Sequence, residues 1–139
     1  MPDQTLANNI LMRSIKIVDI GYITVIYIIF SISIATFVDT WMGSFDPKAE
    51  EKKGFWQQTG EIILFMWSYG VLIYFVRNIV ELIPFPLDGY QGFEHLRVKE
   101  LKSAMVFTFT FILFCDYIKK KMLFYYKNTI RPFTSMNKK

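Results

Sequence analysis

The sequence predicts an all-α integral membrane protein, a single membrane domain of residues 1–139 with three transmembrane helices. Its composition is the first reason, because 53% of the residues are hydrophobic and 18% are aromatic, with a mean hydropathy of +0.27. A chain of 139 residues cannot bury so much apolar surface in one soluble core, so we expect the excess to face lipid. The second reason is the presence of three apolar runs without a charged residue, at 20–38, 62–76 and 103–115.

The first run lies between Asp19 and Asp39 and predicts a span at about residues 20–38. At about 1.5 Å per residue, a helix of this length covers roughly 30 Å, the thickness of a bilayer core. Ser33-Ile34-Ala35 has the small-residue pattern of a signal-peptide cleavage site. The run is longer than a usual signal-peptide core, and the residues before it are not strongly basic. We therefore expect a retained transmembrane helix.

The second and third runs are shorter than a full crossing requires. Apolar flanks extend the second run to a span at about residues 58–77. Aromatic and snorkelling lysine side chains would extend the third to about residues 102–118, although a run this short is also compatible with a re-entrant segment. Because no proline or glycine interrupts the chain between Phe93 and Pro132, we expect one long third helix that extends beyond the bilayer.

Three crossings place the N-terminus and the loop 78–101 on one face of the membrane. The loop 39–57 and the tail 119–139 lie on the other face. Counted to the edges of the charge-free runs, Lys and Arg number 2 + 4 = 6 on the first face and 3 + 7 = 10 on the second. The positive-inside rule therefore predicts a cytoplasmic C-terminus. Within the loop 39–57, Asp46 followed by Pro47 predicts a short, charged, solvated helix that ends at Gly54.

Aromatic and basic residues gather beside the loop 39–57 and after the third span. Such rings prefer the headgroup level of a bilayer, and lysines there attract anionic headgroups. Basic tails also bind nucleic acid, but lipid needs no further partner, so no nucleic acid is expected. The predicted lipid-interface residues are Trp41, Trp56, Lys119, Lys120, Lys121, Tyr125 and Tyr126.

The residues that carry most enzyme chemistry are scarce. Cys115 is the only cysteine and His95 the only histidine, which argues against a disulfide framework and a Cys-based zinc site. Nucleotide-binding, zinc-protease and nucleophile-elbow motifs are absent, as is a potassium-type selectivity filter. His95 as a general base or metal ligand is weighed against a surface or interface residue, and the second interpretation is preferred. We expect a protein without catalytic activity, metal or cofactor.

The loop 84–100 has the strongest signs of a protein contact. Its two prolines restrict the backbone, and Asp88-Gly89 predicts a turn. A rigid loop with aromatic anchors loses little entropy on binding, which favours a docking surface. The alternative is that its rings lie in the interfacial aromatic belt. The predicted docking residues are Phe85, Asp88, Tyr90, Phe93, His95 and Arg97.

The segment 83–100, IPFPLDGYQGFEHLRVKE, resembles a loop in small multi-span membrane proteins of nucleocytoplasmic large DNA viruses. Such proteins lie in the internal membrane and contact the icosahedral capsid. The resemblance implies a non-catalytic minor capsid component of the virion, with the loop as its link to neighbouring membrane or capsid proteins. The alternative is an accessory subunit of a large membrane complex, such as a respiratory assembly, since such subunits are also small, hydrophobic and without catalytic residues.

Overall fold

The computed structural model describes residues 2–132, without the side chains of residues 2–4 and Glu100, and every regular element in that part is helical. In chain order the elements are α1 (Pro2–Met42), α2 (Pro47–Glu51), α3 (Phe55–Glu81), the 3-10 helices η1 (Tyr90–Gly92) and η2 (His95–Arg97), α4 (Lys99–Ser103), α5 (Met105–Phe114), α6 (Asp116–Tyr125) and the π-helix η3 (Tyr126–Ile130). By length and composition, α1 and α3 are each apolar enough to cross a membrane. The predicted spans 20–38 and 58–77 lie inside these two helices.

Several hydroxyl groups in the apolar run of helix α1 bond to the helix's own backbone. Thr24 donates to the Ile20 carbonyl at 2.7 Å, and Ser33 and Thr36 make the same contact one turn back along the chain. Such bonds satisfy these three hydroxyl groups where the helix surface is apolar. The helix is followed by Gly43, whose φ of +74° is a left-handed conformation that glycine adopts without steric cost.

The short helix α2 begins as the sequence predicts. The Asp46 carboxylate accepts the backbone N–H of Lys48 at 3.0 Å, and Pro47 occupies the first helical position. The helix ends at Glu51, however, and Gly54 directly precedes α3. The prediction that Gly54 ends the short helix is therefore wrong.

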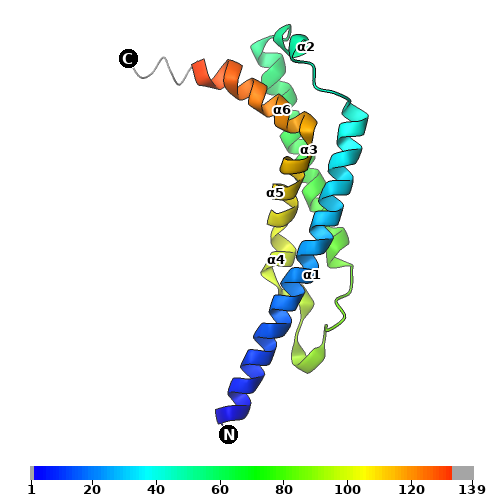
Figure 1. Ribbon diagram of the computed structural model, residues 1–139, viewed down its shortest axis with the longest axis vertical. Helices are drawn as coiled ribbons and strands as arrows, with labels where there is room; N and C mark the ends of the chain where they lie inside the picture. Colours follow the sequence, from blue (N-terminus) through cyan, green and yellow to red (C-terminus); the bar gives the residue numbers. More distant parts are fainter. Residues whose placement is uncertain (1, 133–139) are drawn as a thin grey trace, which may run out of the picture.

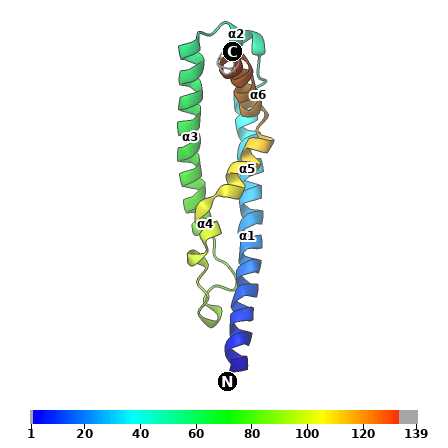
Figure 2. The same cartoon turned by 90° about the vertical axis from the view of Figure 1, so that its left-hand side faces the viewer.

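The long helices form an elongated bundle in which α5 lies against α1 (Figure 1). Seen from the side, α3 stands on the opposite edge from α1, with α4 and α5 crossing between them (Figure 2). Helices α2 and α6 lie at one end of the bundle, and the N-terminus lies at the other. The buried core runs along the middle and includes Ile23, Tyr27, Val76, Val80, Phe107 and Phe111.

The third apolar segment is not one long helix. Ala104 adopts a left-handed conformation with φ +48°, which separates α4 from α5, and Cys115 is extended, which separates α5 from α6. Beyond Cys115, α6 turns away from the bundle axis (Figure 1). The prediction of a continuous third helix is wrong because side chains of α1 supply hydrogen bonds at both breaks, as described below. Tertiary contacts therefore interrupt a helix that contains no proline or glycine.

The third segment runs parallel to α1 in a nearly constant register. Asp19 contacts His95, Ser31 contacts Phe107 and Asp39 contacts Cys115, and each pair is separated by 76 residues along the chain. The 20 residues from Asp19 to Asp39 are therefore matched by the 20 residues from His95 to Cys115. Along α1 this distance is about 30 Å at 1.5 Å per residue.

Candidate functional site

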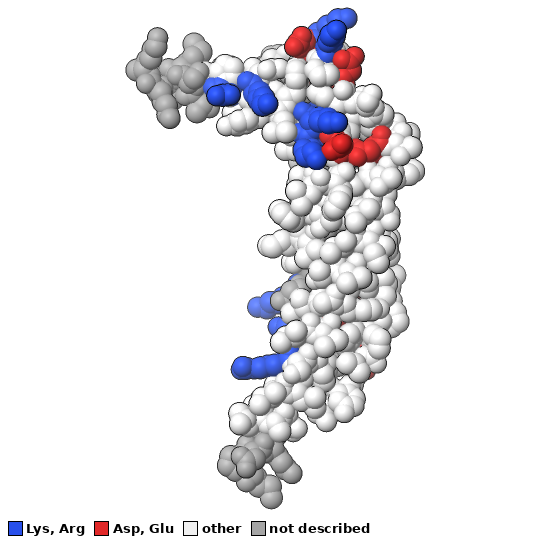
Figure 3. Space-filling view, viewed as in Figure 1, with Lys and Arg blue, Asp and Glu red and all other residues white. Residues whose placement is uncertain are grey.

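An uncharged belt separates two charged ends of the molecule. On the face shown in Figure 3, Lys, Arg, Asp and Glu gather at the α2 and α6 end, and Lys and Arg appear again lower down, with white surface between them. Apolar side chains of α1 and α3 point outward from this belt, including Val25, Phe37 and Trp67, which are 57%, 70% and 68% exposed. A soluble protein rarely exposes apolar surface so continuously.

A buried contact between Asp19 and His95 lies near the lower charged end of the molecule. The His95 Nδ1 atom lies 2.7 and 2.9 Å from the two carboxylate oxygens of Asp19, and both residues are almost fully buried. Because a carboxylate only accepts hydrogen bonds, Nδ1 carries the donated proton. The other ring nitrogen, Nε2, is buried without a hydrogen-bond partner in the described part of the chain. This pair fastens the loop between α3 and α4 to α1.

Aromatic packing completes this attachment. The Phe85 ring stacks on His95 with centroids 5.5 Å apart, and the Phe93 ring contacts Phe85 edge-on at 6.0 Å. Tyr22 of α1 packs against Phe85 and donates its hydroxyl to the Pro84 carbonyl at 3.0 Å. The loop is therefore folded onto α1 within the same chain.

Three of the six predicted docking residues are consequently buried. The exposed fractions of Phe85, Phe93 and His95 are 5%, 6% and 3%. The expectation that Phe85 and Phe93 are exposed anchors is wrong, because burying both rings against α1 removes their apolar surface from water. The interpretation of His95 as a surface residue is wrong for the same reason, since its ring is held by Asp19.

The other three predicted docking residues remain at the surface. Tyr90 is 51% exposed, and Arg97 is exposed and pairs with Glu94 at 2.5 Å. Asp88 is exposed but also shapes the loop, because its carboxylate accepts the backbone N–H of His95 at 2.8 Å. Docking through these residues stays a prediction.

Side chains of α1 satisfy the backbone of the interrupted third segment. The Tyr27 hydroxyl donates to the Leu101 carbonyl, and the Ser31 hydroxyl donates to the Phe107 carbonyl at 3.2 Å. These bonds lie on either side of Ala104, which is completely buried. The break is thus enclosed by protein, where polar backbone groups find partners.

At the upper limit of the belt, the Asp39 side chain also satisfies backbone groups of the third segment. Its carboxylate accepts the backbone N–H groups of Asp116 and Tyr117, both at 2.9 Å, and the Cys115 thiol lies 3.3 Å away. A carboxylate at the N-terminus of a helix satisfies two N–H groups that otherwise have no helical partner. An aspartate of α1 therefore caps α6, a helix that begins 77 residues later.

A cluster of four charged residues joins α2, α3 and α6. The Lys121 ammonium group lies 3.1 Å from Glu50 and 2.5 Å from Glu61, and Lys53 lies 2.8 Å from each of the same carboxylates. Hydrogen bonds to Glu50 and Glu61 raise the pKa of Lys53. Burial alone would lower the pKa of Lys121, but its hydrogen bonds to Glu61 and Glu50 outweigh burial and raise it. Both ammonium groups are therefore held in the charged form.

The predicted lipid contact of Lys121 is wrong, because this residue belongs to the cluster. Lys121 is only 7% exposed, because consecutive helical residues point in different directions and this lysine points towards the two carboxylates. Glu50 is 5% exposed, so α2 is not simply a solvated helix as the sequence predicts.

The remaining predicted interface residues lie at or near the surface. Trp41 and Trp56 are 79% and 84% exposed, and Tyr126 is 53% exposed. Lys119 is partly buried and Lys120 is exposed, and both contact Asp116, at 2.8 and 3.6 Å. Tyr125 is less exposed, and its hydroxyl lies 2.9 Å from the Thr59 hydroxyl. Contact of these side chains with lipid stays a prediction.

Sequence reasoning missed Asp19, Asp39 and Glu50 as partners of the third segment and α6. One available signal was the equal spacing of 20 residues between Asp19 and Asp39 and between His95 and Cys115. Among the described residues, no group of three His, Cys, Asp or Glu side chains is close enough to hold a metal ion. Comparisons with known protein families, curated proteins and solved structures found no match to this chain.

Proposed function

We propose that this chain is a multi-pass integral membrane protein whose third segment also crosses the bilayer, parallel to α1. The observation that carries the proposal is the register between Asp19–His95 and Asp39–Cys115. If α1 crosses between its two aspartates, the parallel third segment is carried in the same direction, with its charged residues 97–102 near one membrane surface and its charge-free residues 103–115 in the bilayer. The Asp39 contacts then lie at one membrane surface, the Asp19–His95 contact lies beyond the other, and the uncharged belt lies between them.

The breaks in the third segment are compatible with a crossing. Irregular backbone is tolerated at membrane depth only where it is enclosed by protein and its polar groups are satisfied. Both conditions support the proposal here, since Ala104 and Cys115 have no exposed surface and α1 provides donors and acceptors beside each break.

The excess of positive charge lies at the α2 and α6 end. Among the described residues this end, 39–61 and 116–132, carries eight Lys and Arg against six in 2–19 and 77–102. The positive-inside rule therefore favours a cytoplasmic position for α2 and α6.

The proposed role is structural. The chain would hold two surfaces at fixed positions on a bilayer, namely the α2–α6 end and the loop between α3 and α4. The resemblance of residues 83–100 supports a minor capsid component in the internal membrane of a large DNA virus, which links the bilayer to a protein shell. In such a role the linking contacts of the loop would come from its exposed side chains, such as Tyr90 and Arg97, because Phe85 and Phe93 pack on α1.

Accessibility labelling in sealed vesicles tests the three crossings. In a Cys115→Ala background, single cysteines at Lys52 and Lys127 should react from one side, and cysteines at Arg13 and Lys99 from the other. All four positions are exposed, so the reagent can reach each of them. Labelling of Lys127→Cys from the same side as Lys99→Cys would show that the third segment does not cross. Release of the chain by alkaline carbonate would refute membrane insertion altogether.

Fractionation tests the structural role. Purified virions that contain the chain would support the viral assignment. Recovery from mitochondrial membranes would instead favour the alternative of an accessory subunit in a respiratory assembly.

A further inference from the structure

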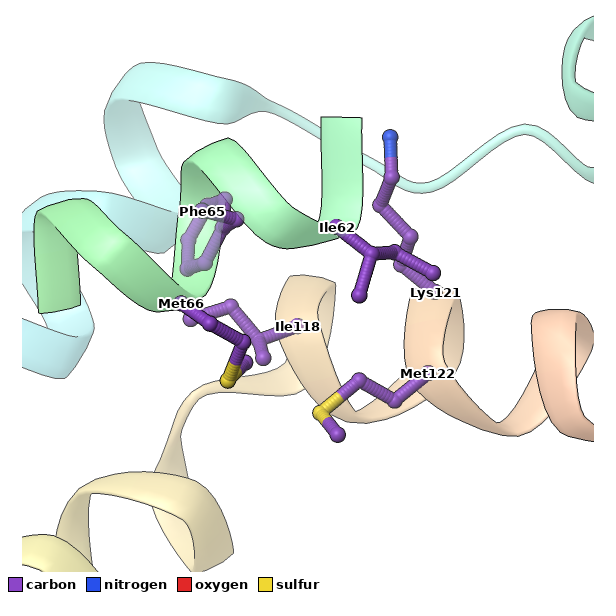
Figure 4. Close-up of a pocket in the computed structure, with 6 residues that line it drawn as sticks. All are labelled: Ile62, Phe65, Met66, Ile118, Lys121 and Met122. Carbon is purple, nitrogen blue, oxygen red and sulfur yellow. The ribbon is translucent and has the colours of Figure 1, made fainter. Parts of the chain in front are cut away.

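Two mostly apolar hollows are lined by side chains of α3 and α6, including Lys121 of the charged cluster. The smaller hollow is lined by Ile62, Phe65, Met66, Ile118, Lys121 and Met122, which converge from α3 and α6 (Figure 4). The larger is an open groove of about 440 Å³ between α3, the end of α1 and α6. Its lining includes Trp41, Leu64, Phe65, Ser68 and Tyr117, with Glu61 and Lys121 at its polar edge.

The larger groove is poorly suited to water. Glu61 and Lys121 are paired with each other at 2.5 Å, and the Ser68 hydroxyl already donates to the Leu64 carbonyl at 2.9 Å. A water molecule needs two to four polar partners, and because the lining is mostly apolar, few such partners are available. An empty groove would also leave its apolar walls without dispersion contacts on one side. An apolar occupant is therefore favoured.

The size of the groove decides between a lipid chain and a helix. A helix with its side chains is about 10–12 Å across and rises about 5.4 Å per turn, so 440 Å³ holds roughly one turn. A single turn buries too little to dock a partner helix, whereas a flexible acyl chain can fill an open groove of this shape. The groove also lies beside Trp41, at the limit of the uncharged belt, where the headgroup of a membrane lipid would be placed.

The charges at the edge indicate the kind of headgroup. The Lys53 and Glu61 side chains are 25% and 31% exposed and lie side by side at 2.8 Å. Together they present one positive and one negative group, which complements a headgroup that carries both charges. The cluster of Glu50, Lys53, Glu61 and Lys121 has no net charge, so it offers no particular attraction to an anionic headgroup.

We propose that this groove binds one acyl chain of a zwitterionic glycerophospholipid, with the headgroup against Lys53 and Glu61. The inference rests on the proposed membrane insertion and names a lipid partner for the α2–α6 end. The bound lipid would fill the space between α1 and α3 and would stabilise the position of α3, whose apolar surface is mostly outside the protein core.

The test is lipid retention by the full chain. Protein reconstituted in equal parts of phosphatidylcholine and phosphatidylglycerol is extracted into detergent, exchanged exhaustively and analysed by native mass spectrometry. We expect one phosphatidylcholine per wild-type chain. Ser68→Phe, which places a ring in the groove, should lose it, whereas Ile63→Phe, on the outer surface of α3 where the native side chain is 64% exposed, should retain it.

Each other outcome overturns the inference. Equal retention by Ser68→Phe and Ile63→Phe, or no retention by wild type, would show that the groove holds no specific lipid. Preferential retention of phosphatidylglycerol would contradict a zwitterionic headgroup. Disulfide cross-linking between two Leu64→Cys chains in a Cys115→Ala background would identify a second copy as the occupant. Resistance of each variant to carbonate extraction and an unchanged helical signal distinguish failure of this inference from failure of insertion.

Discussion

Replacement of Lys121 by methionine tests whether the charged cluster holds α6 on the bundle. The Lys121 side chain is 9% exposed and bridges Glu50, which is 7% exposed, to Glu61. Removing one partner of a buried ion pair costs about 3–5 kcal/mol because the other charge is left uncompensated. We expect the lower end, about 3 kcal/mol, because Lys53 still contacts both carboxylates. A loss of this size raises the population of detached α6 roughly 100-fold.

Limited proteolysis measures this population. Chymotrypsin cleaves after Phe124 and Tyr125 only when α6 opens, so in detergent its rate follows the opened fraction and should rise about 100-fold in Lys121→Met. Lys120→Met is the matched control, since Lys120 is exposed and its contact with Asp116 is 3.6 Å long, and no measurable change is expected. Equal cleavage rates for Lys121→Met and Lys120→Met would refute the argument that a buried charge pair fastens α6.

A double variant separates the lost bridge from the orphaned charge. Glu50→Gln combined with Lys121→Met leaves no uncompensated charge at Glu50, so its loss should be smaller than the sum of the two single losses. Strict additivity would mean that Glu50 and Lys121 do not interact in solution.

Three further changes test other contacts. The raised pKa values of Lys53 and Lys121 mean that their contribution to stability is complete below pH 10.5 and declines as the pH rises further, so chymotrypsin cleavage of α6 should accelerate only above that pH. Asp39→Ala removes the cap of α6 and should cost about 1 kcal/mol, visible as a several-fold faster cleavage of α6. Phe93→Ala removes a buried ring and should cost about 3–5 kcal/mol, measured as trypsin cleavage within the loop between α3 and α4, while Tyr90→Ala should change little.

The long helices were predictable because their signal is local. The charge-free runs at 20–38 and 62–76 require only the residues themselves to indicate a helix, and both lie inside helices of the structure. The breaks at Ala104 and Cys115 were not predictable in this way. Neither residue is a helix breaker, and the hydrogen bonds that stabilise the breaks come from α1, more than 70 residues earlier.

In the candidate site, too, local features were predictable from the sequence and long-range contacts were not. The composition of the loop 84–100 predicts a rigid segment with aromatic anchors, and the structure contains both features. What the composition cannot indicate is the surface to which the anchors bind, and here that surface is α1 of the same chain. The run Lys119–Lys121 is different, because helix geometry alone spreads three consecutive side chains over about 200°. This geometry already indicates that the three lysines do not share one environment.

The two aspartates at the ends of the first apolar run also hold the third segment in position along α1. An unpaired carboxylate at the edge of a bilayer would remain hydrated and would set only the depth of its own helix. Here each carboxylate binds a different end of the third segment, Asp19 through a side chain and Asp39 through backbone N–H groups. The register between the two is therefore fixed, because α1 cannot shift along its own axis without carrying the third segment with it. Such coupling explains how a segment with only ten residues in its central helix, α5, stays aligned with α1 from Asp19 to Asp39.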